Sequence, residues 1–190
     1  MIPSGIQRLR WELPAVLSAE DDGLPTLART VVTELQARLL ELDERIAGHD
    51  RRIAQVARQQ EATKRLMRVE GVGPSTATAI VATVGEAKAF HHGRQFAAWL
   101  GLVPKQCSTG GKPRLGRITK RGNVYLRTLL IHGARSVLQW TPQRTDAKRV
   151  WGEEVRQRRG DNMAAGALAA KHARILWALL AGGQEYRMAA

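Results

Sequence analysis

The longest pattern in the chain is a run of apolar positions between Pro25 and Arg68. Proline is favoured as a first helical residue, and only one glycine follows in the segment, so we expect a helix of about 40 residues over 25–68. The apolar positions alternate spacings of four and three, which is typical of a coiled-coil seam. They are Ala28, Val32, Leu35, Leu39, Leu42, Ile46, Ile53 and Val56, with His49 in the remaining slot. The segment therefore predicts a homo-oligomer formed through residues 25–68; one long helix packed against the chain's own C-terminal helices is the alternative.

Shorter patterns fill the rest of the chain. Residues 1–24 predict a lead-in segment with a short helix. Helical spacing then predicts a domain over 69–186, with two helices around a turn at 66–85, a helix ending near Leu100, one beginning after Asn123 and a last one capped by Asn162. The segment 102–123 has no helical period and reads as a long loop that has room for a short hairpin. Since no long stretch alternates with period two, the predicted fold class is all-α: a long coiled-coil helix followed by a helical domain with a long basic loop.

Charge divides the chain into two parts. The net charge is +13, from 30 Lys plus Arg against 17 Asp plus Glu. Residues 1–70 hold equal numbers of basic and acidic side chains, so the whole excess lies in residues 71–190. Residues 87–140 contain ten cations and no carboxylate, and such a segment repels itself unless a polyanion neutralises it. We expect DNA or RNA as the partner; a solvated basic face that serves only solubility is the alternative.

The turn Gly71-Val72-Gly73-Pro74 has the form of a helix-hairpin-helix motif. Glycines allow the backbone to approach a phosphate, and the first N–H groups of the following helix point toward it. We therefore expect Gly71 and Gly73 to contact nucleic-acid phosphates. A plain tight turn has the same sequence.

The basic loop supplies the other candidate nucleic-acid contacts. Long loops inside a compact domain are usually functional, and this one is rich in Lys and Arg. The candidates in and just after it are Lys105, Lys112, Arg114, Arg117, Lys120, Arg121 and Arg127.

Several protein classes are excluded or disfavoured by composition. The single cysteine, Cys107, excludes an internal disulfide framework and a Cys-rich zinc module. No uninterrupted apolar run is long enough for a membrane span, and no signal-peptide pattern begins the chain, so we expect no membrane partner and a cytoplasmic, nucleoid-associated protein. The few acids after residue 71 are scattered, whereas a two-metal nuclease site needs several convergent carboxylates. We predict no metal site and no cofactor in this chain.

Four stretches together resemble the C-terminal domain of a large family of bacterial insertion-sequence transposases. They are residues 71–74, 96–104, 108–112 and 116–127. The resemblance implies DNA transposition by an enzyme that also has an N-terminal RNase-H-like domain with four metal-binding acids, and that uses a structured guide RNA. Only the coiled coil and the C-terminal domain have counterparts here, so Mg²⁺ is expected only in the acidic domain, and this fragment alone is expected to be inactive.

The resemblance also places a nucleophilic serine in Ser108-Thr109-Gly110-Gly111. Two hydroxyl residues precede the glycines, and we assign the role to Ser108, with Thr109 as the alternative. Attack on a phosphodiester would store its energy in a phosphoserine bond for resealing to a new strand. The other open interpretation is a non-catalytic helix-hairpin-helix module that binds nucleic acid and self-associates.

Overall fold

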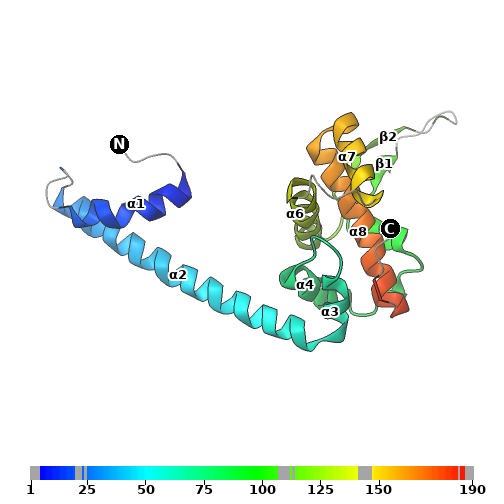
Figure 1. The fold of residues 1–190 in the computed structure, drawn as a ribbon, viewed down its shortest axis with the longest axis horizontal. Coiled ribbons are helices and arrows are strands. Elements are labelled where there is room, and N and C mark those ends of the chain that lie inside the picture. The colour runs from blue at the N-terminus through cyan, green and yellow to red at the C-terminus, as the bar shows by residue number, and fades with distance from the viewer. Residues whose placement is uncertain are drawn as a thin grey trace. The chain divides into compact units, whose positions relative to one another are not determined.

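The computed structural model describes residues 5–19, 23, 25–106, 112, 114–140, 147–183 and 185–186. Its order of elements is α1 (Ile6–Ser18), α2 (Thr26–Gln59), α3 (Glu61–Met67), α4 (Pro74–Val84), a 3₁₀ turn η1 (Ala87–Ala89), α5 (Gly93–Trp99), β1 (Pro104–Gln106), β2 (Leu115–Ile118), α6 (Val124–Trp140), α7 (Ala147–Arg159) and α8 (Asp161–Gly182) (Figure 1). The all-α prediction is confirmed, with one small two-stranded sheet in the predicted loop. The chain divides into two compact units, Met1–Arg51 and Arg52–Ala190.

In the first unit, α1 lies along α2. The Arg10 guanidinium donates to the Asp43 carboxylate at 3.1 Å, and Arg29 donates to the Leu17 carbonyl at 2.6 Å. The earlier residue of α1, Arg10, thus meets the later residue of α2, and Leu17 near the end of α1 meets Arg29 near the start of α2, so the two helices run antiparallel. The predicted lead-in is therefore a helix that packs on the predicted coiled-coil segment.

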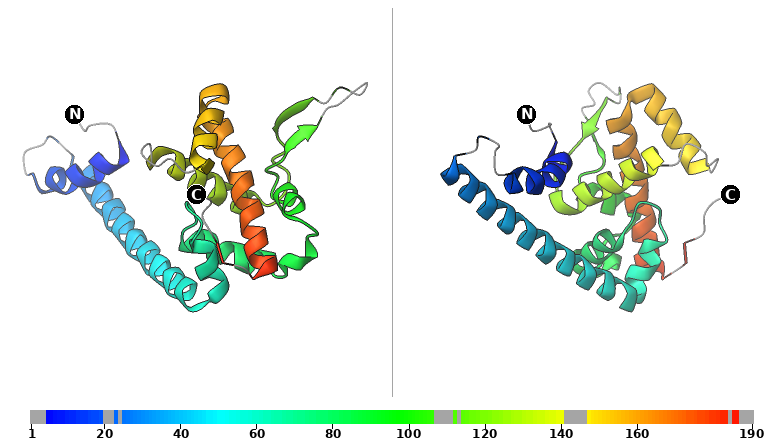
Figure 2. Two further views of the ribbon diagram at one scale, coloured as in Figure 1. Left: turned by 45° about the vertical axis from the view of Figure 1, so that its right-hand side comes forward. Right: turned by 60° about the vertical axis from the view of Figure 1, so that its left-hand side comes forward.

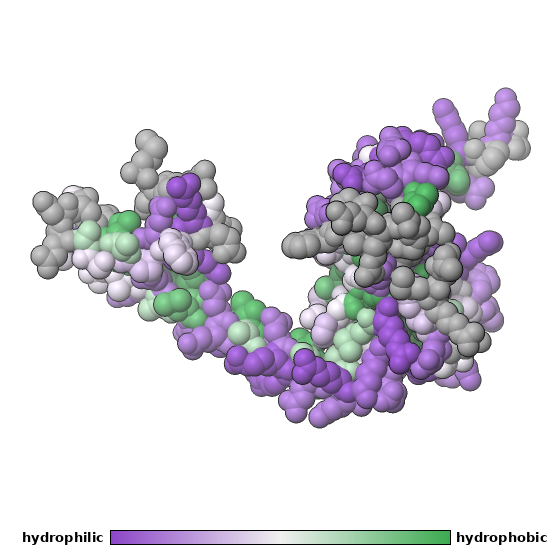
Figure 3. Space-filling view, viewed as in Figure 1, coloured by the Kyte–Doolittle hydropathy of each residue, from purple (hydrophilic) through white to green (hydrophobic). Residues whose placement is uncertain are grey.

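Much of the predicted seam remains exposed in the single chain. Leu35 is 64% exposed and Ile46 is 57% exposed, whereas Val32 and Leu39 are half-buried. Figure 3 shows hydrophobic side chains following one another along α2 between hydrophilic ones. This face of α2 therefore presents apolar surface to solvent, which is typical of a helix that packs against another protein chain.

The prediction of one continuous helix over 25–68 is wrong at Gln60. This residue has an extended backbone, with φ −95° and ψ 124°, and separates α2 from α3. The buried Thr63 hydroxyl donates to the Ala57 carbonyl at 2.6 Å and lies 2.7 Å from the Gln60 carbonyl oxygen. The threonine hydroxyl thus bridges the Ala57 carbonyl in the last turn of α2 and the Gln60 carbonyl, which also accepts the Lys64 N–H of α3 at 3.1 Å, and this stabilises the break.

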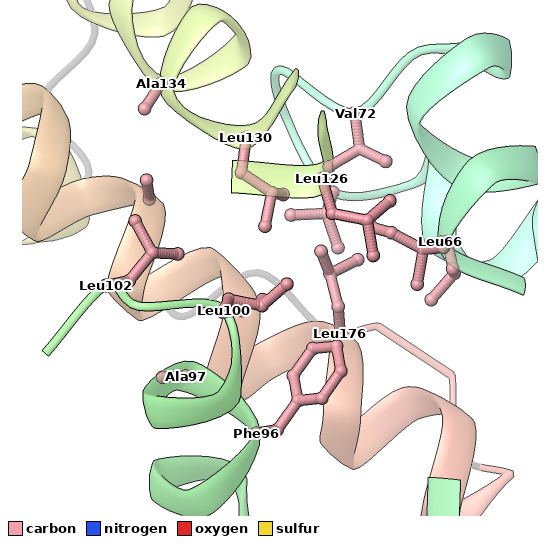
Figure 4. Close-up of a cluster of buried hydrophobic side chains, with 14 of the residues drawn as sticks. Leu66, Val72, Phe96, Ala97, Leu100, Leu102, Leu126, Leu130, Ala134 and Leu176 are labelled. Carbon is pink, nitrogen blue, oxygen red and sulfur yellow. The ribbon is translucent and has the colours of Figure 1, made fainter. Parts of the chain in front are cut away.

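The second unit is built around α8, which packs against α5, α6 and α7. The core brings together Phe96 of α5, Leu126 and Leu130 of α6, and Leu176 of α8, with Leu66 of α3 beside them (Figure 4). Each of these side chains is at most 1% exposed. Burial of one such side chain contributes about 1.5–3 kcal/mol, so this cluster fixes the helices that hold the basic segment.

Helix ends agree with the sequence in part. Asn123 caps α6 as predicted, since its side chain accepts from the Leu126 N–H at 3.0 Å, and Gly183 ends α8 in a left-handed conformation. The predicted N-cap at Asn162 is wrong, because α8 begins at Asp161 and Gly160 precedes it with φ 80°. The Asn162 side chain instead accepts from Arg135 at 2.9 Å. The predicted start at Thr141-Pro142 lies outside the described residues.

Candidate nucleic-acid interface

The predicted basic loop contains an antiparallel two-stranded ribbon. Pro104 lies opposite Ile118, and Gln106 lies opposite Leu115, with an irregularity in the register between these two pairs. We call β1, β2 and the neighbouring residues Lys112 and Arg114 the ribbon. Its described residues are exposed except Ile118, which is half-buried where the ribbon joins the helices.

The backbone segments 99–103 and 119–122, which we call the root, join the ribbon to α5 and α6. The Thr119 N–H donates to the Val103 carbonyl at 2.9 Å, and the Lys120 N–H donates to the Gly101 carbonyl at 3.1 Å. Lys120 has φ 55°, which is uncommon for a residue with a side chain. The two ends of the ribbon are thus held together by backbone hydrogen bonds next to the core.

Glycine is required at two positions of the root. Gly122 has φ 115°, and a Cβ there would lie 1.9 Å from the Trp99 carbonyl oxygen. Gly101 has φ 71°, and a Cβ there would lie 2.1 Å from the Arg121 carbonyl oxygen. The chain entering the ribbon and the chain leaving it therefore pack backbone against backbone, which no other residue type permits without displacement.

Arg127 stabilises the same place from α6. Its side chain is only 8% exposed, and its guanidinium donates to the Leu100 carbonyl at 3.1 Å. Leu100 lies in the first segment of the root, so this bond ties α6 to the chain that enters the ribbon. The sequence predicts a nucleic-acid contact for Arg127; in the structure its side chain, one turn into α6, is buried against the Leu100 carbonyl.

The remaining candidate cations surround the ribbon and its root. Lys105 lies on β1 and Arg117 on β2, Lys112 and Arg114 lie beyond the strands, and Lys120 and Arg121 lie in the root; all six are exposed. The ribbon thus presents positive charge to solvent. The hydroxyl candidates Ser108 and Thr109 lie outside the described residues.

The Gly71–Gly73 turn joins α3 to α4, so two helices flank it as expected. Gly71 has φ 76°, and a Cβ there would lie 2.5 Å from the Gly133 carbonyl oxygen of α6. Gly73 has an ordinary φ of −86° and precedes Pro74, the first residue of α4. Packing on α6 therefore explains the glycine at 71, and sequence reasoning missed its partner Gly133, which looks like an ordinary small helical residue.

The described residues contain no group of three His, Cys, Asp or Glu side chains placed to hold a metal ion. Within the same residues, no helix is long and apolar enough to cross a membrane.

Comparison with known proteins points in the same direction as these features. Residues 63–149, from α3 to the start of α7, match the family described as Transposase IS116/IS110/IS902 family. This segment contains the α3–α4 turn, the ribbon, the root and Arg127. The matched segment is therefore similar to a transposase domain.

Several proteins similar to this chain are named as transposases. The chain is 50% identical over 175 residues to a Pseudomonas aeruginosa protein named "Probable family 20 transposase", covering 92% of this chain and 52% of that protein. It is 44% identical over 186 residues to the transposase for insertion sequence element IS1111A of Coxiella burnetii, covering 98% and 51%. It is 34% identical over 167 residues to the transposase for IS1328 of Yersinia enterocolitica, covering 88% and 50%. The chain spans about half the length of these curated relatives.

Proposed function

We propose that this chain supplies the DNA-binding and strand-exchange part of a DNA transposase. The observation that carries the proposal is the ribbon, a carboxylate-free, cation-bearing element within the segment that matches the transposase family. Exposed Lys and Arg side chains bind phosphates irrespective of base sequence. DNA is the proposed partner, and a structured guide RNA is the second nucleic acid expected from the family resemblance.

In the proposed chemistry, Ser108 is the nucleophile. Its Oγ loses a proton and forms a bond to phosphorus, while the departing sugar oxygen takes a proton and leaves as a hydroxyl. Attack by the hydroxyl of another strand then restores the serine and reseals the backbone. Lys112, Arg114 and Arg117 would neutralise the charge that develops on the phosphoryl oxygens.

Ser108→Ala separates the enzyme from a nucleic-acid clamp. With the N-terminal half of a transposase relative supplied as a fusion or in trans, we expect this variant to lose strand transfer and the covalent protein–DNA adduct on a nicked substrate. DNA affinity should stay nearly unchanged, because a neutral hydroxyl contributes little to binding built on charge. Thr109→Ala is the control and should remain active.

Mass spectrometry of the trapped adduct gives the direct result. A phosphodiester-linked peptide carrying Ser108 supports the assignment, whereas a link on Thr109 moves the role by one residue. Full activity of the Ser108→Ala/Thr109→Ala double variant would refute both assignments and leave the non-catalytic binding module as the function.

We further propose that a second copy of this chain covers the exposed face of α2. The observation that favours it is the set of apolar side chains in the seam pattern, including Leu35 and Ile46, that the single chain leaves in solvent. Leu35→Asp/Ile46→Asp should give monomers in light scattering. Leu40 is 58% exposed but lies outside the seam, so Leu40→Asp is the matched control and should leave the oligomer intact. A monomeric wild-type chain at tens of micromolar would refute this proposal.

A further inference from the structure

The ribbon is unusual because the part that the structure describes is open to solvent on both faces. Sheets in small domains normally bury at least one face. Here all three β1 residues are exposed, and so are Leu115, Gly116 and Arg117 of β2. Figure 1 and the left view of Figure 2 show the two strands extending beyond the helices of the second unit.

Such a ribbon needs support from elsewhere, because an isolated two-stranded hairpin is only marginally stable in water. The root supplies it through Gly101, Gly122 and the two backbone hydrogen bonds. Arg127 adds a buried bond to the Leu100 carbonyl. The second unit therefore holds the ribbon from its base while leaving both faces accessible.

An apolar side chain stands among the cations of the ribbon. Leu115 is 68% exposed. It therefore gives up most of the free energy that a leucine side chain gains when it is buried. It lies between Arg114 and Gly116 on the strand that also carries Arg117. This arrangement suits binding to DNA, in which the cations contact backbone phosphates and the apolar side chain contacts the edge of a base.

The dimensions select one kind of groove. The major groove of B-form DNA is about 12 Å wide and admits a two-stranded ribbon, whose strands lie about 4.8 Å apart. The major groove of A-form RNA is too deep and narrow for side chains to read. The minor groove of B-DNA is about 6 Å wide and too narrow for a ribbon with side chains on both strands.

We propose that the ribbon enters the major groove of duplex DNA as an arm, with Arg127 as the positioning residue that fixes its root. The inference rests on the proposed DNA-binding function and specifies how the binding is made. Lys105 and Arg117 then contact phosphates, and Leu115 contacts the edge of a base, for example a thymine methyl group. Arg127 does not touch DNA and acts through the Leu100 carbonyl.

A basic edge also protects exposed strands from pairing with other chains, and this is the competing explanation of the same residues. This explanation predicts that the affinity for DNA does not depend on which groove is accessible. The two explanations therefore differ in a measurable way.

The decisive experiment blocks one groove at a time. Binding of the 190-residue chain to a short fluorescent DNA duplex is measured by anisotropy. It is repeated with a duplex whose cytosines carry glucosylated hydroxymethyl groups in the major groove, with the minor groove filled by netropsin, and with an RNA duplex of the same sequence. We expect glucosylation to weaken binding about tenfold or more, and netropsin to leave it within about twofold.

Two matched pairs of variants test the residues. Leu115→Gln should weaken binding to the unmodified duplex a few-fold and binding to the glucosylated duplex hardly at all. Val124 is similarly exposed, at 63%, and Val124→Gln should leave binding to both duplexes unchanged. Arg127→Lys keeps the charge and should lower affinity without changing the salt dependence, while amide hydrogen exchange at Thr119 and Lys120 becomes faster. If amide hydrogen exchange at Thr119 and Lys120 is as slow in Arg127→Gln as in the wild type, the positioning role of Arg127 is refuted.

The outcomes also separate this inference from the function beneath it. If the chain binds the native, glucosylated and RNA duplexes equally, nucleic-acid binding stands and the major-groove arm is refuted. Displacement by netropsin, or preference for the RNA duplex, refutes the arm in the same way. If no duplex binds at low salt, the proposed DNA-binding function fails together with the arm.

Discussion

The ribbon and helix α7 both carry arginines, but they differ in whether these arginines pair with carboxylates. In α7, Arg156 contacts Asp161 at 2.6 Å and Glu153 at 3.3 Å, and Arg158 contacts Glu154 at 3.8 Å. The hydrogen bond from Arg156 to Asp161, reinforced by the charge of Glu153, raises the pKa of Arg156 above its ordinary value. In the described part of the chain, no ion pair joins Lys105 or Arg117 of the ribbon to a carboxylate.

From this difference we expect the location of carboxylates, more than the number of arginines, to mark a surface that binds a polyanion. Exposed ion pairs contribute only about 0–1 kcal/mol to folding, so those of α7 stabilise little. They do oblige an incoming phosphate to compete with a carboxylate that is already in place. A phosphate that approaches Lys105 or Arg117 would release counterions without that competition.

The largest expected effect separates the two regions directly. Lys105→Gln/Arg117→Gln/Lys120→Gln should reduce DNA affinity on the order of 10²-fold at 0.1 M salt, because three lost phosphate contacts lower the salt slope by about 2.7. Arg156→Gln/Arg158→Gln removes charges of the same sign from α7 and should change affinity a few-fold at most. Isothermal titration calorimetry of both variants makes the comparison. Equal losses would abolish the distinction between paired and unpaired arginines.

A smaller effect is expected from a glycine of the root compared with one of the ribbon. Gly122→Ala should lower the free energy of unfolding by about 2–4 kcal/mol, because the new Cβ would overlap the Trp99 carbonyl oxygen and the φ of 115° disfavours a side chain. Gly116→Ala is the control within β2: its Cβ would meet no atom closer than 3.7 Å, and we expect a change of less than about 1 kcal/mol. Urea denaturation of the two variants measures the difference. Similar stabilities would mean that the root is not closely packed.

The smallest expected effect concerns a paired charge in α3. A hydrogen bond from Lys64 to the Glu61 carboxylate, at 2.6 Å, together with the positive charge of Lys64, lowers the pKa of Glu61. A lowered pKa stabilises the fold at pH values above the ordinary pKa of glutamate, and this contribution disappears as the pH falls through the lowered pKa. Lys64→Met should return the pKa of Glu61 toward its ordinary value in an NMR titration. An unchanged pKa would show that the pair does not form in solution.

The sequence predicted the elements with strong local signals. The apolar spacing of α2, the cap at Asn123 and the carboxylate-free segment each depend on residues close in the chain, and the structure contains the corresponding helices and an exposed basic ribbon. Even the hairpin was anticipated as a possibility within the loop, since Gly and Pro punctuate a segment without helical period.

The features that the sequence did not reveal depend on contacts beyond its local patterns. Arg127 looks like one more cation, and only its approach to the Leu100 carbonyl, 27 residues earlier, reveals a structural bond. Gly71 looks like a phosphate-binding glycine, but its packing partner Gly133 lies on another helix. The break at Gln60 follows from a threonine hydroxyl that caps carbonyls, which the heptad pattern does not register.

The central claim is that the exposed cations of the ribbon and root bind nucleic-acid phosphates, and the salt dependence of DNA binding by the wild-type chain tests it most directly. Six exposed candidate cations surround the ribbon. If about five of them meet phosphates, log K plotted against log salt should fall with a slope of about −4 to −5 between low and moderate salt. An affinity that does not change over this range would contradict the account.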